Sequence, residues 1–402
     1  MPLAYRLLPV THDMRAASEN EETRTEDGVG MARILVADDQ ADVREALSLL
    51  LKMDYDVEVV ASPAALLAAL DRRPFDLVLM DLNYARGTTS GQEGLDLLPA
   101  IRARDARLPV VVMTAWATVD LAIEGLRHRV GDFVRKPWDN GQLLATVRAQ
   151  VLAARARRAA EKLHERELAG AREIQAALLP RQLPSAPGLG VAAAWQPAAG
   201  LGGDHYDVFE VQPRRIAMCI ADVAGKGMAA ALLMSNLQAA VRALAAEGWT
   251  PGELCGHLRR VMAPRLTDEK FVTLVYLVLD ATTRRLSYAN AGHNAPILAR
   301  ADGTYARLES GGPVIAGVAA GRYTEEHLAL RPGDRLVLFT DGVSELPGAT
   351  GEELGEPRLV ELVLSHRHLD ASALKDRLLD AARAFGGGSF VDDATLLVLA
   401  ID

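Results

Sequence analysis

Residues 216–233, IAMCIADVAGKGMAAALL, determine how the C-terminal half of the chain folds. An apolar run that predicts a buried strand ends at Asp222, a glycine-rich turn containing Lys226 follows, and a run typical of a helix comes next. A carboxylate beside such a turn fits either a nucleotide phosphate loop or a metal site. The phosphate-loop pattern needs a glycine at position 220 and Ser or Thr at position 227. This chain has Ile220 and Gly227 there, so the nucleotide interpretation weakens.

Other carboxylates of the same half lie beside apolar runs that predict strands. Asp204 stands in LGGDHYD, Asp341 follows LVLFT, and Asp392 and Asp393 stand in VDDAT. Taken singly, each acid is more often a turn residue. Four such positions in one half favour a cleft that holds two hard divalent ions, which activate a water molecule for attack on phosphorus.

The region from residue 33 to about residue 151 alternates short apolar runs with amphipathic segments. This pattern predicts an α/β domain with a doubly wound parallel sheet and helices on both faces. Polar residues end its strands: Asp38 and Asp39, Asp81, Thr114, and Lys136. Because the carboxyl ends of parallel strands meet at one edge, these side chains should converge. Three carboxylates repel one another, so the sequence predicts a bound Mg²⁺, with Lys136 adding positive charge.

Residues 148–179 favour one long helix, since they contain no proline and a single glycine, Gly170. Apolar residues follow coiled-coil spacing and then shift register: Leu152, Ala156, Ala159 and Leu163, followed by Leu168, Ala171, Ile174 and Leu178. Two interpretations stay open, a solvated spacer and a helix that dimerises or transmits a signal. The regular spacing favours the second. Pro180 ends the helix.

After residue 180 the pattern changes to many apolar strands of an antiparallel type with two pairs of helices. The helices are predicted at residues 228–246, 251–263, 356–365 and 370–385. Such a pattern indicates an α+β sandwich.

Composition limits the function classes. The chain has 402 residues, which predicts two or three domains, and its 44 Lys and Arg against 53 Asp and Glu give a net charge of -9. This balance argues against a broad nucleic-acid surface. The two cysteines, Cys219 and Cys255, cannot build a disulfide framework, and no uninterrupted apolar run looks long enough for a membrane span. We therefore expect a cytoplasmic protein without a nucleic-acid or membrane partner, and a disordered acidic tail over residues 1–31.

The acidic pair, the central aspartate, the Thr, the Lys-Pro pair and an aromatic at Phe133 resemble a response-regulator receiver domain. The resemblance implies that Asp81 accepts a phosphoryl group from a sensor histidine kinase. It further implies a Mg²⁺ site at Asp38, Asp39 and Asn83, and a phosphorylation switch at Thr114, Phe133 and Lys136. The loop 83–94 is about five residues longer than is usual in the family. It either alters access to Asp81 or is an idle insertion.

The second half resembles the SpoIIE-type branch of the metal-dependent serine/threonine phosphatases (PPM). The motifs, in order, are LLP, GGDHYD, DVAGKGMAAALLM, NAGHNAP, GGPVIAG, LRPGDRLVLFTDGVSE and DDAT. The resemblance implies an αββα sandwich and two Mn²⁺ or Mg²⁺ ions. It assigns a bridging role to Asp222 and direct ligation to the Val223 carbonyl, Asp341 and Asp392. Asp204 would contact a metal directly or through water, and Asp393 would position Asp392 or metal-bound water.

This chain departs from that family at the glycine-rich turn, where many members have Ser and His and this chain has Ala224 and Lys226. The proton donor for the leaving group is therefore unassigned, with metal-bound water as the default. No arginine stands shortly before Asp204 to hold the phosphate. For His293, in NAGHN, a structural hydrogen-bonding role is favoured over an acid role.

The expected organisation is a tail (1–31), a receiver domain (32–147), a helical linker (148–179) and a phosphatase domain (180–402). The expected function is a phosphatase controlled by Asp81 phosphorylation that acts on a phosphorylated regulatory protein such as an anti-anti-sigma (STAS) factor, with a homodimer formed through the linker. The alternative is a catalytically weak scaffold that captures a phosphoprotein, but the full set of carboxylates favours catalysis. A DNA-binding response regulator is disfavoured, because no helix-turn-helix pattern follows the receiver.

Overall fold

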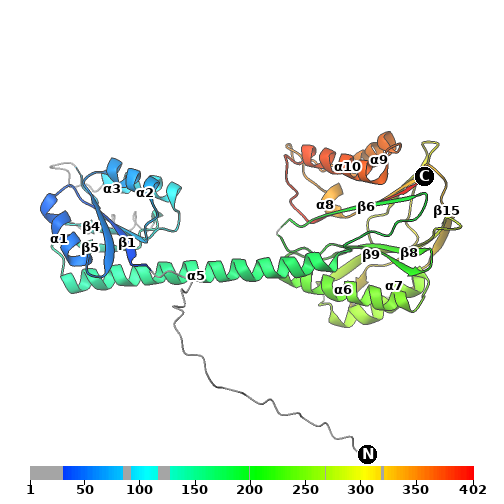
Figure 1. Cartoon of the computed structure of the whole chain (residues 1–402), viewed down its shortest axis with the longest axis horizontal. Coiled ribbons are helices and arrows are strands. Elements are labelled where there is room, and N and C mark those ends of the chain that lie inside the picture. Colours follow the sequence, from blue (N-terminus) through cyan, green and yellow to red (C-terminus); the bar gives the residue numbers. More distant parts are fainter. Residues whose placement is uncertain (1–29, 85–91, 116–126, 199, 268, 318–320) are drawn as a thin grey trace, which may run out of the picture. The chain divides into compact units, whose positions relative to one another are not determined.

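The computed structural model describes residues 30–402 except 85–91, 116–126, 199, 268 and 318–320 (Figure 1). The chain divides between Lys162 and Leu163 into two compact units. The acidic tail predicted over residues 1–31 lies almost entirely outside the described residues.

The first unit contains a five-stranded sheet in the order β2-β1-β3-β4-β5, in which all neighbouring strands are parallel. This confirms the predicted doubly wound α/β fold. The elements are β1 (Ala32–Ala37), α1 (Ala41–Leu51), β2 (Tyr55–Val60), α2 (Pro63–Arg72), β3 (Leu77–Asp81), α3 (Gln92–Arg104), β4 (Val110–Thr114) and β5 (Asp132–Arg135). Helix α5 (Asn140–Leu178) follows, so the last receiver helix and the predicted linker form one element.

The central strands of this sheet are buried on both faces. Along β1, Leu35 belongs to the apolar cluster that includes Leu98 of α3, whereas Ile34 belongs to the cluster that includes Leu47 of α1 and Leu143 of α5. Because alternate side chains point to opposite faces, a strand covered on both sides must be apolar throughout. This explains the continuous runs ILVA, LVLM and VVVM.

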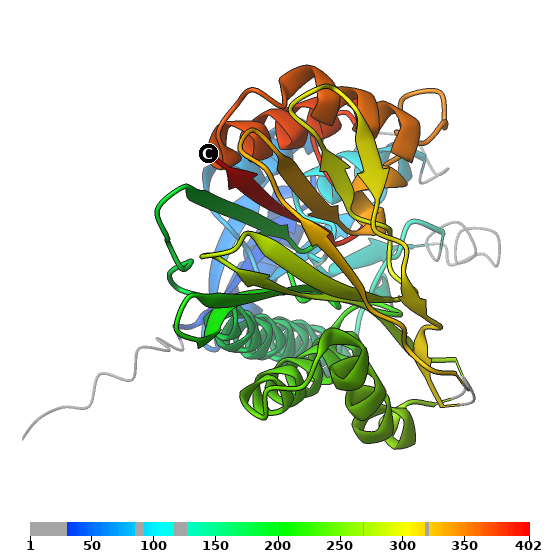
Figure 2. The same ribbon diagram turned by 90° about the vertical axis from the view of Figure 1, so that its right-hand side faces the viewer.

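The second unit is a sandwich of two sheets with helices on both outer faces (Figures 1 and 2). One sheet has the order β13-β10-β9-β8-β7, with β14 on β9 and β15 on β10; its pairs are antiparallel except β10 with β13. Its strands are β7 (His205–Gln212), β8 (Arg215–Val223), β9 (Phe271–Asp280), β10 (Arg285–Ala291), β13 (Gly311–Gly312), β14 (Ile315–Ala316) and β15 (Glu326–Ala329). The other is antiparallel, in the order β12-β11-β16-β17-β6, with β6 (Leu189–Gln196), β11 (Ile297–Ala299), β12 (Tyr305–Arg307), β16 (Arg335–Phe339) and β17 (Ala394–Ile401).

Helices α6 (Met228–Ala246) and α7 (Pro251–Met262) cover the first of these sheets, and α9 (Glu356–His366) and α10 (Ala371–Phe385) cover the second (Figure 2). A short 3-10 turn, η1 (Ala263–Arg265), follows α7, and the short α8 (Asp341–Ser344) follows β16. The predicted αββα sandwich is therefore confirmed, and its four long helices begin and end within one residue of the predicted bounds.

Strand β8 shows how the layers are joined. Ile216, Met218 and Ile220 belong to the core between the two sheets, while Cys219 belongs to the core beneath α6 and α7. The alternation has a period of two, as a strand between two apolar layers requires. Both cysteines are buried free thiols that serve as packing residues.

Helix α6 is long and apolar enough to span a membrane by length and composition. The expectation that no apolar run is long enough for a membrane span was therefore wrong, because residues 228–246 after Lys226 suffice by length and composition. In the fold, Met234, Leu237 and Val241 of α6 are buried against the sheet. The apolar character of α6 is accounted for by its place in the core of the sandwich.

A buried ion pair fastens α6 to β7. The fully buried carboxylate of Asp207 accepts two hydrogen bonds from the Arg242 guanidinium, at 2.5 and 2.7 Å. The guanidinium also lies 4.0 Å from the centre of the Phe209 ring. Burial raises the pKa of Asp207, and Arg242 opposes this rise. Arg242 is therefore the main group that stabilises the charge of Asp207.

Arg242→Ala is expected to lower the free energy of unfolding of the second unit by about 3 kcal/mol, because it leaves a buried carboxylate without its counter-charge. Urea unfolding followed by circular dichroism measures this change. Arg383→Ala is the matched control, since the ion pair of Arg383 with Asp380 is long, at 3.7 Å, and exposed, and its loss should cost less than about 0.5 kcal/mol. Equal stability of both variants would show that the buried pair contributes nothing.

Candidate functional site

The carboxyl edge of the first sheet brings three predicted acids together. Asp38, Asp39 and Asp81 each offer an oxygen atom, and these atoms lie within 4.8 Å of one another. The Lys136 Nζ atom lies 2.7 Å from Asp38 and 2.9 Å from Asp81. Burial raises the pKa of Asp38, although Lys136 and the Gln40 amide oppose the rise. One buried oxygen of Asp39 has no hydrogen-bond partner in the described part of the chain, which suits a hard cation.

The predicted switch residues lie on the neighbouring strands. Thr114 ends β4 and is buried, and its carbonyl accepts a hydrogen bond from the Lys136 amide at 2.8 Å. Phe133 is half-buried in β5 opposite Val112. Asn83 follows β3 by two residues and is half-buried. Of the extended loop 83–94, residues 85–91 lie outside the described residues, so its predicted effect on access stays untested.

Sequence reasoning missed one neighbour of this cluster, Tyr84. Its hydroxyl donates to the Ala37 carbonyl at 3.3 Å, across the end of β1. Burial raises the pKa of Tyr84, and the nearby charge of Asp81 raises it further. The only sequence signal was its place three residues after Asp81.

In the second unit the predicted acids come from the same end of both sheets. Asp204 precedes β7 and Asp222 lies near the end of β8, in one sheet. Asp341 follows β16, and Asp392 and Asp393 precede β17, in the other. Strands β16 and β17 are neighbours, as are β7 and β8. The facing sheets therefore present the five acids to one another.

The pKa shifts of these acids indicate that their charges act on one another. The pKa of Asp222 is raised to about 7, first by burial and then by the charges of Asp341, Asp392 and Asp393. The pKa of Asp204 is raised well above its ordinary value by burial and by Asp222. Within the described residues, however, the acids of the second unit do not form a group as tight as the one at Asp81.

Asp204 is held by two threonines that the sequence analysis did not single out. One of its oxygens accepts hydrogen bonds from the Thr340 hydroxyl at 2.7 Å and the Thr395 hydroxyl at 2.6 Å. The other oxygen is buried and has no partner among the described residues. Because an unpartnered buried carboxylate oxygen is costly, it suits a metal ligand. Both threonines stood inside recognised motifs, TDG and DDAT.

Asp393 orients the backbone in front of Asp204. Its two oxygens accept hydrogen bonds from the Ala198 amide at 2.9 Å and the Gly203 amide at 2.7 Å. Its own amide donates to Asp392 at 2.9 Å. Asp393 therefore contacts Asp392, as its predicted positioning role requires, and it also holds the loop that carries Asp204.

The two residues that depart from the family pattern lie beside Asp392 and Lys270. Lys226 Nζ lies 2.9 Å from an Asp392 oxygen and 3.3 Å from the Val391 carbonyl. Lys270 Nζ donates to the Ala224 carbonyl at 2.8 Å. Two cations therefore flank the glycine-rich turn and offset part of the acidic charge.

His293 is buried within the fold and makes structural contacts. Its Nε2 lies 3.1 Å from the Phe339 carbonyl, which can only accept, so Nε2 carries the proton and Nδ1 accepts from the Thr273 hydroxyl at 2.7 Å. Burial lowers the pKa of His293 to about 4. A neutral histidine with both nitrogens engaged agrees with the structural role that the sequence favoured.

The glycines of GGD allow close approach of backbone segments. A Cβ atom on Gly203 would lie 2.5 Å from the Val223 carbonyl oxygen, and one on Gly202 would lie 2.5 Å from an Asp393 oxygen. Real side chains do not tolerate such distances. Gly203 therefore lets the loop before β7 lie against the end of β8, and Gly202 lets it lie against Asp393.

Comparisons with known proteins agree with this arrangement. A family model described as Stage II sporulation protein E (SpoIIE) matches residues 212–402, and one described as Response regulator receiver domain matches residues 34–148. Phosphoserine phosphatase RsbU of Bacillus subtilis is 31% identical over 234 residues, which cover 58% of this chain and 69% of RsbU. Protein IcfG of Synechocystis sp. is 28% identical over 58% of this chain, which spans only 41% of IcfG. The solved SiaA-PP2C domain of Pseudomonas aeruginosa has a TM-score of 0.55 and 25% identity, covering 61% of this chain and 99% of that domain.

Gly203→Ala is expected to lower the free energy of unfolding by about 2 kcal/mol, because the added methyl group must displace the Val223 carbonyl. Gly256→Ala is the control: no atom lies within 4 Å of its Cβ position inside α7, so this variant should be neutral or stabilised by up to about 1 kcal/mol. Urea unfolding measures both. A Gly203→Ala protein as stable as the control would contradict the close approach of the two segments.

Proposed function

This chain belongs to the SpoIIE-type family of metal-dependent serine/threonine protein phosphatases and carries a response-regulator receiver domain, and we propose that it hydrolyses phosphoserine or phosphothreonine on a regulatory partner protein under the control of Asp81. The observation that carries the proposal is the shared acidic region at the end of the sandwich. There the pKa of Asp222 is raised first by burial and then by the charges of acids from the facing sheet. We assign residues 32–147 to the receiver domain, 148–179 to the linker and 180–402 to the phosphatase domain.

The acids of the sandwich fit divalent metal, as the family requires. The unpartnered buried oxygen of Asp204 and the mutual repulsion around Asp222 both favour a positive charge between them. We propose two Mn²⁺ or Mg²⁺ ions, held by Asp222, the Val223 carbonyl, Asp341 and Asp392, with Asp204 as a direct or water-mediated contact. Such ions supply an activated water molecule for attack on phosphorus. In the receiver, Asp38, Asp39 and Asn83 would hold one Mg²⁺.

The other residues of the site position these groups. Thr340 and Thr395 orient Asp204, and Asp393 fixes the loop in front of it. Lys226 lies against Asp392, where its charge offsets an acid in the absence of the His usual at that position. His293, being neutral and fully engaged, is not the acid for the leaving group.

The partners follow from the two domains. The receiver domain implies a sensor histidine kinase that phosphorylates Asp81 in the cytoplasm. The likeness to RsbU, named a phosphoserine phosphatase, supports a phosphoprotein substrate, and we propose one of the anti-anti-sigma (STAS) type. A homodimer through α5 is supported by exposed apolar residues at regular intervals of eleven: Leu152, Leu163 and Ile174, which are 58%, 58% and 68% exposed.

Asp222→Asn and Asp341→Asn are each expected to reduce manganese-dependent release of phosphate from a phosphoserine peptide by at least about a thousandfold, since each removes a charge from the shared metal site. Circular dichroism should show an intact fold. The wild-type rate also separates catalysis from the scaffold alternative, because a scaffold would bind the phosphopeptide without turnover. Full activity of Asp222→Asn would contradict the metal assignment.

Phosphorylation of Asp81 is expected to change the phosphatase rate, because it adds negative charge beside Thr114 and Lys136. These residues lie at the edge of the sheet where β5 ends, shortly before α5 begins. The rate on one phosphopeptide should be compared for the full chain with and without a stable phosphoryl mimic, for Asp81→Asn with the mimic, and for residues 174–402. The mimic should alter the rate of the wild type and leave Asp81→Asn unchanged. Equal rates throughout would exclude control by the receiver.

A further inference from the structure

The last turns of α5 contact the loop in front of Asp204 through Gln175. The Gln175 side chain is 2% exposed, and both ends of its amide are engaged by one residue. Its Nε2 donates to the Gly202 carbonyl at 2.6 Å, and its Oε1 accepts from the Gly202 amide at 3.1 Å. The amide therefore pairs with Gly202 as a neighbouring strand would, and both hydrogen bonds are shielded from water.

The loop in front of Asp204 is rich in glycine. Gly200, Gly202 and Gly203 have no side chains to pack, and Gly200 has φ 81°, a conformation that glycine adopts at little cost. Two buried side chains hold the loop's backbone: Asp393, at Ala198 and Gly203, and Gln175, at Gly202. Asp393 belongs to the acidic site itself, whereas Gln175 belongs to a different element. Gln175 therefore connects the last turns of α5 to the loop in front of Asp204.

A second residue on the same face of α5 approaches the loop. Arg172 precedes Gln175 by three residues, so the two side chains are neighbours on the helix surface. A Cβ atom on Gly200 would lie within 2.4 Å of three atoms of the Arg172 guanidinium group. Arg172 and Gln175 together place one face of the helix against residues 200–202.

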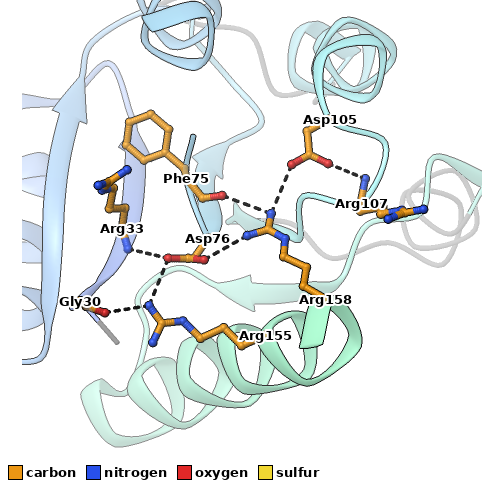
Figure 3. A network of polar contacts seen from close by, with 8 residues as sticks. All are labelled: Gly30, Arg33, Phe75, Asp76, Asp105, Arg107, Arg155 and Arg158. Atoms are coloured by element: carbon orange, nitrogen blue, oxygen red, sulfur yellow. Dashed lines mark hydrogen bonds and ion pairs between the residues drawn. The ribbon is translucent and has the colours of Figure 1, made fainter. Parts of the chain in front are cut away.

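Near its middle, α5 is fastened to the body of the receiver (Figure 3). Arg158 contacts Asp76 at 3.1 Å and Asp105 at 3.2 Å, in the loops before β3 and β4. Arg155 donates to the Gly30 carbonyl at 3.0 Å and lies 3.4 Å from Asp76. One helix therefore carries ionic contacts to the receiver and an amide contact to the candidate active site.

We propose that Gln175 is a positioning residue, which seats Gly202 and hence Asp204, so that the placement of the last turns of α5 sets how well the chain binds divalent metal and turns over substrate. This inference rests on the proposed phosphatase function and names the contact through which α5 would control it. The helix acts on the Asp204 loop, which lies in front of β7.

The test uses the full chain with Gln175→Ala, Gln175→Glu and Glu173→Ala. Gln175→Glu keeps the volume and one acceptor but loses the donor to the Gly202 carbonyl, so it serves if the alanine variant does not fold. Glu173 is exposed on the same turn and serves as the matched control. Mn²⁺ binding is measured by titration calorimetry without substrate, and kcat and KM are measured on a phosphoserine peptide.

Both Gln175 variants are expected to bind Mn²⁺ at least about tenfold more weakly and to lose kcat with KM nearly unchanged, because residues behind metal ligands typically contribute this much. Glu173→Ala should match the wild type. Wild-type Mn²⁺ affinity in the Gln175 variants, or an equal loss in Glu173→Ala, would overturn the inference. If the wild type hydrolyses no phosphopeptide but the Mn²⁺ affinities differ as expected, the proposed function fails and the positioning role of Gln175 stands.

Discussion

Repulsion between carboxylates held close together is the interaction around which both units are arranged. Strand ends collect acids at one edge of a sheet, and each acid raises the free energy of its neighbours unless a donor or a cation faces it. In the first unit Lys136 lies between Asp38 and Asp81. In the second unit, two threonine hydroxyls hydrogen-bond to Asp204, a backbone amide hydrogen-bonds to Asp393, and Lys226 forms an ion pair with Asp392. One buried oxygen of Asp204 has no hydrogen-bond partner among the described residues. The geometry of each site follows from which groups offset the excess negative charge of its acids.

Local patterns were sufficient to predict much of the fold. Period-two and continuous apolar runs located the strands, and the apolar helices were found because their repeat of 3.6 residues covers one face. Asp81 and Asp222 were recognised because each stands at the end of an apolar strand, where acids from several strands can converge. The apolar character of α6 was harder to interpret, since composition alone cannot tell a core helix from a membrane span, and only its packing against β7 to β10 decides.

The supporting residues could not be found in this way, because their roles arise from contacts between distant parts of the chain. Thr340 lies 136 residues from Asp204, and its role depends on two sheets facing each other. Gln175 stands in a helical stretch whose periodicity says nothing about its partner at Gly202. Asp207 and Arg242 look like ordinary charged residues of a strand and a helix until the fold buries the carboxylate. Ligand residues were thus visible in motifs, while the residues that orient them were not.

The continuity of α5 also limits how such proteins can exchange their input domains. A helix turns by about 100° per residue, so a single inserted residue between Arg158 and Gln175 would rotate the amide to another side of the helix. Seven added residues amount to nearly two full turns and would restore its direction to within about 20°. A sensory domain that acts on Gln175 through a continuous helix would therefore keep its effect only at linker lengths that preserve helical phase.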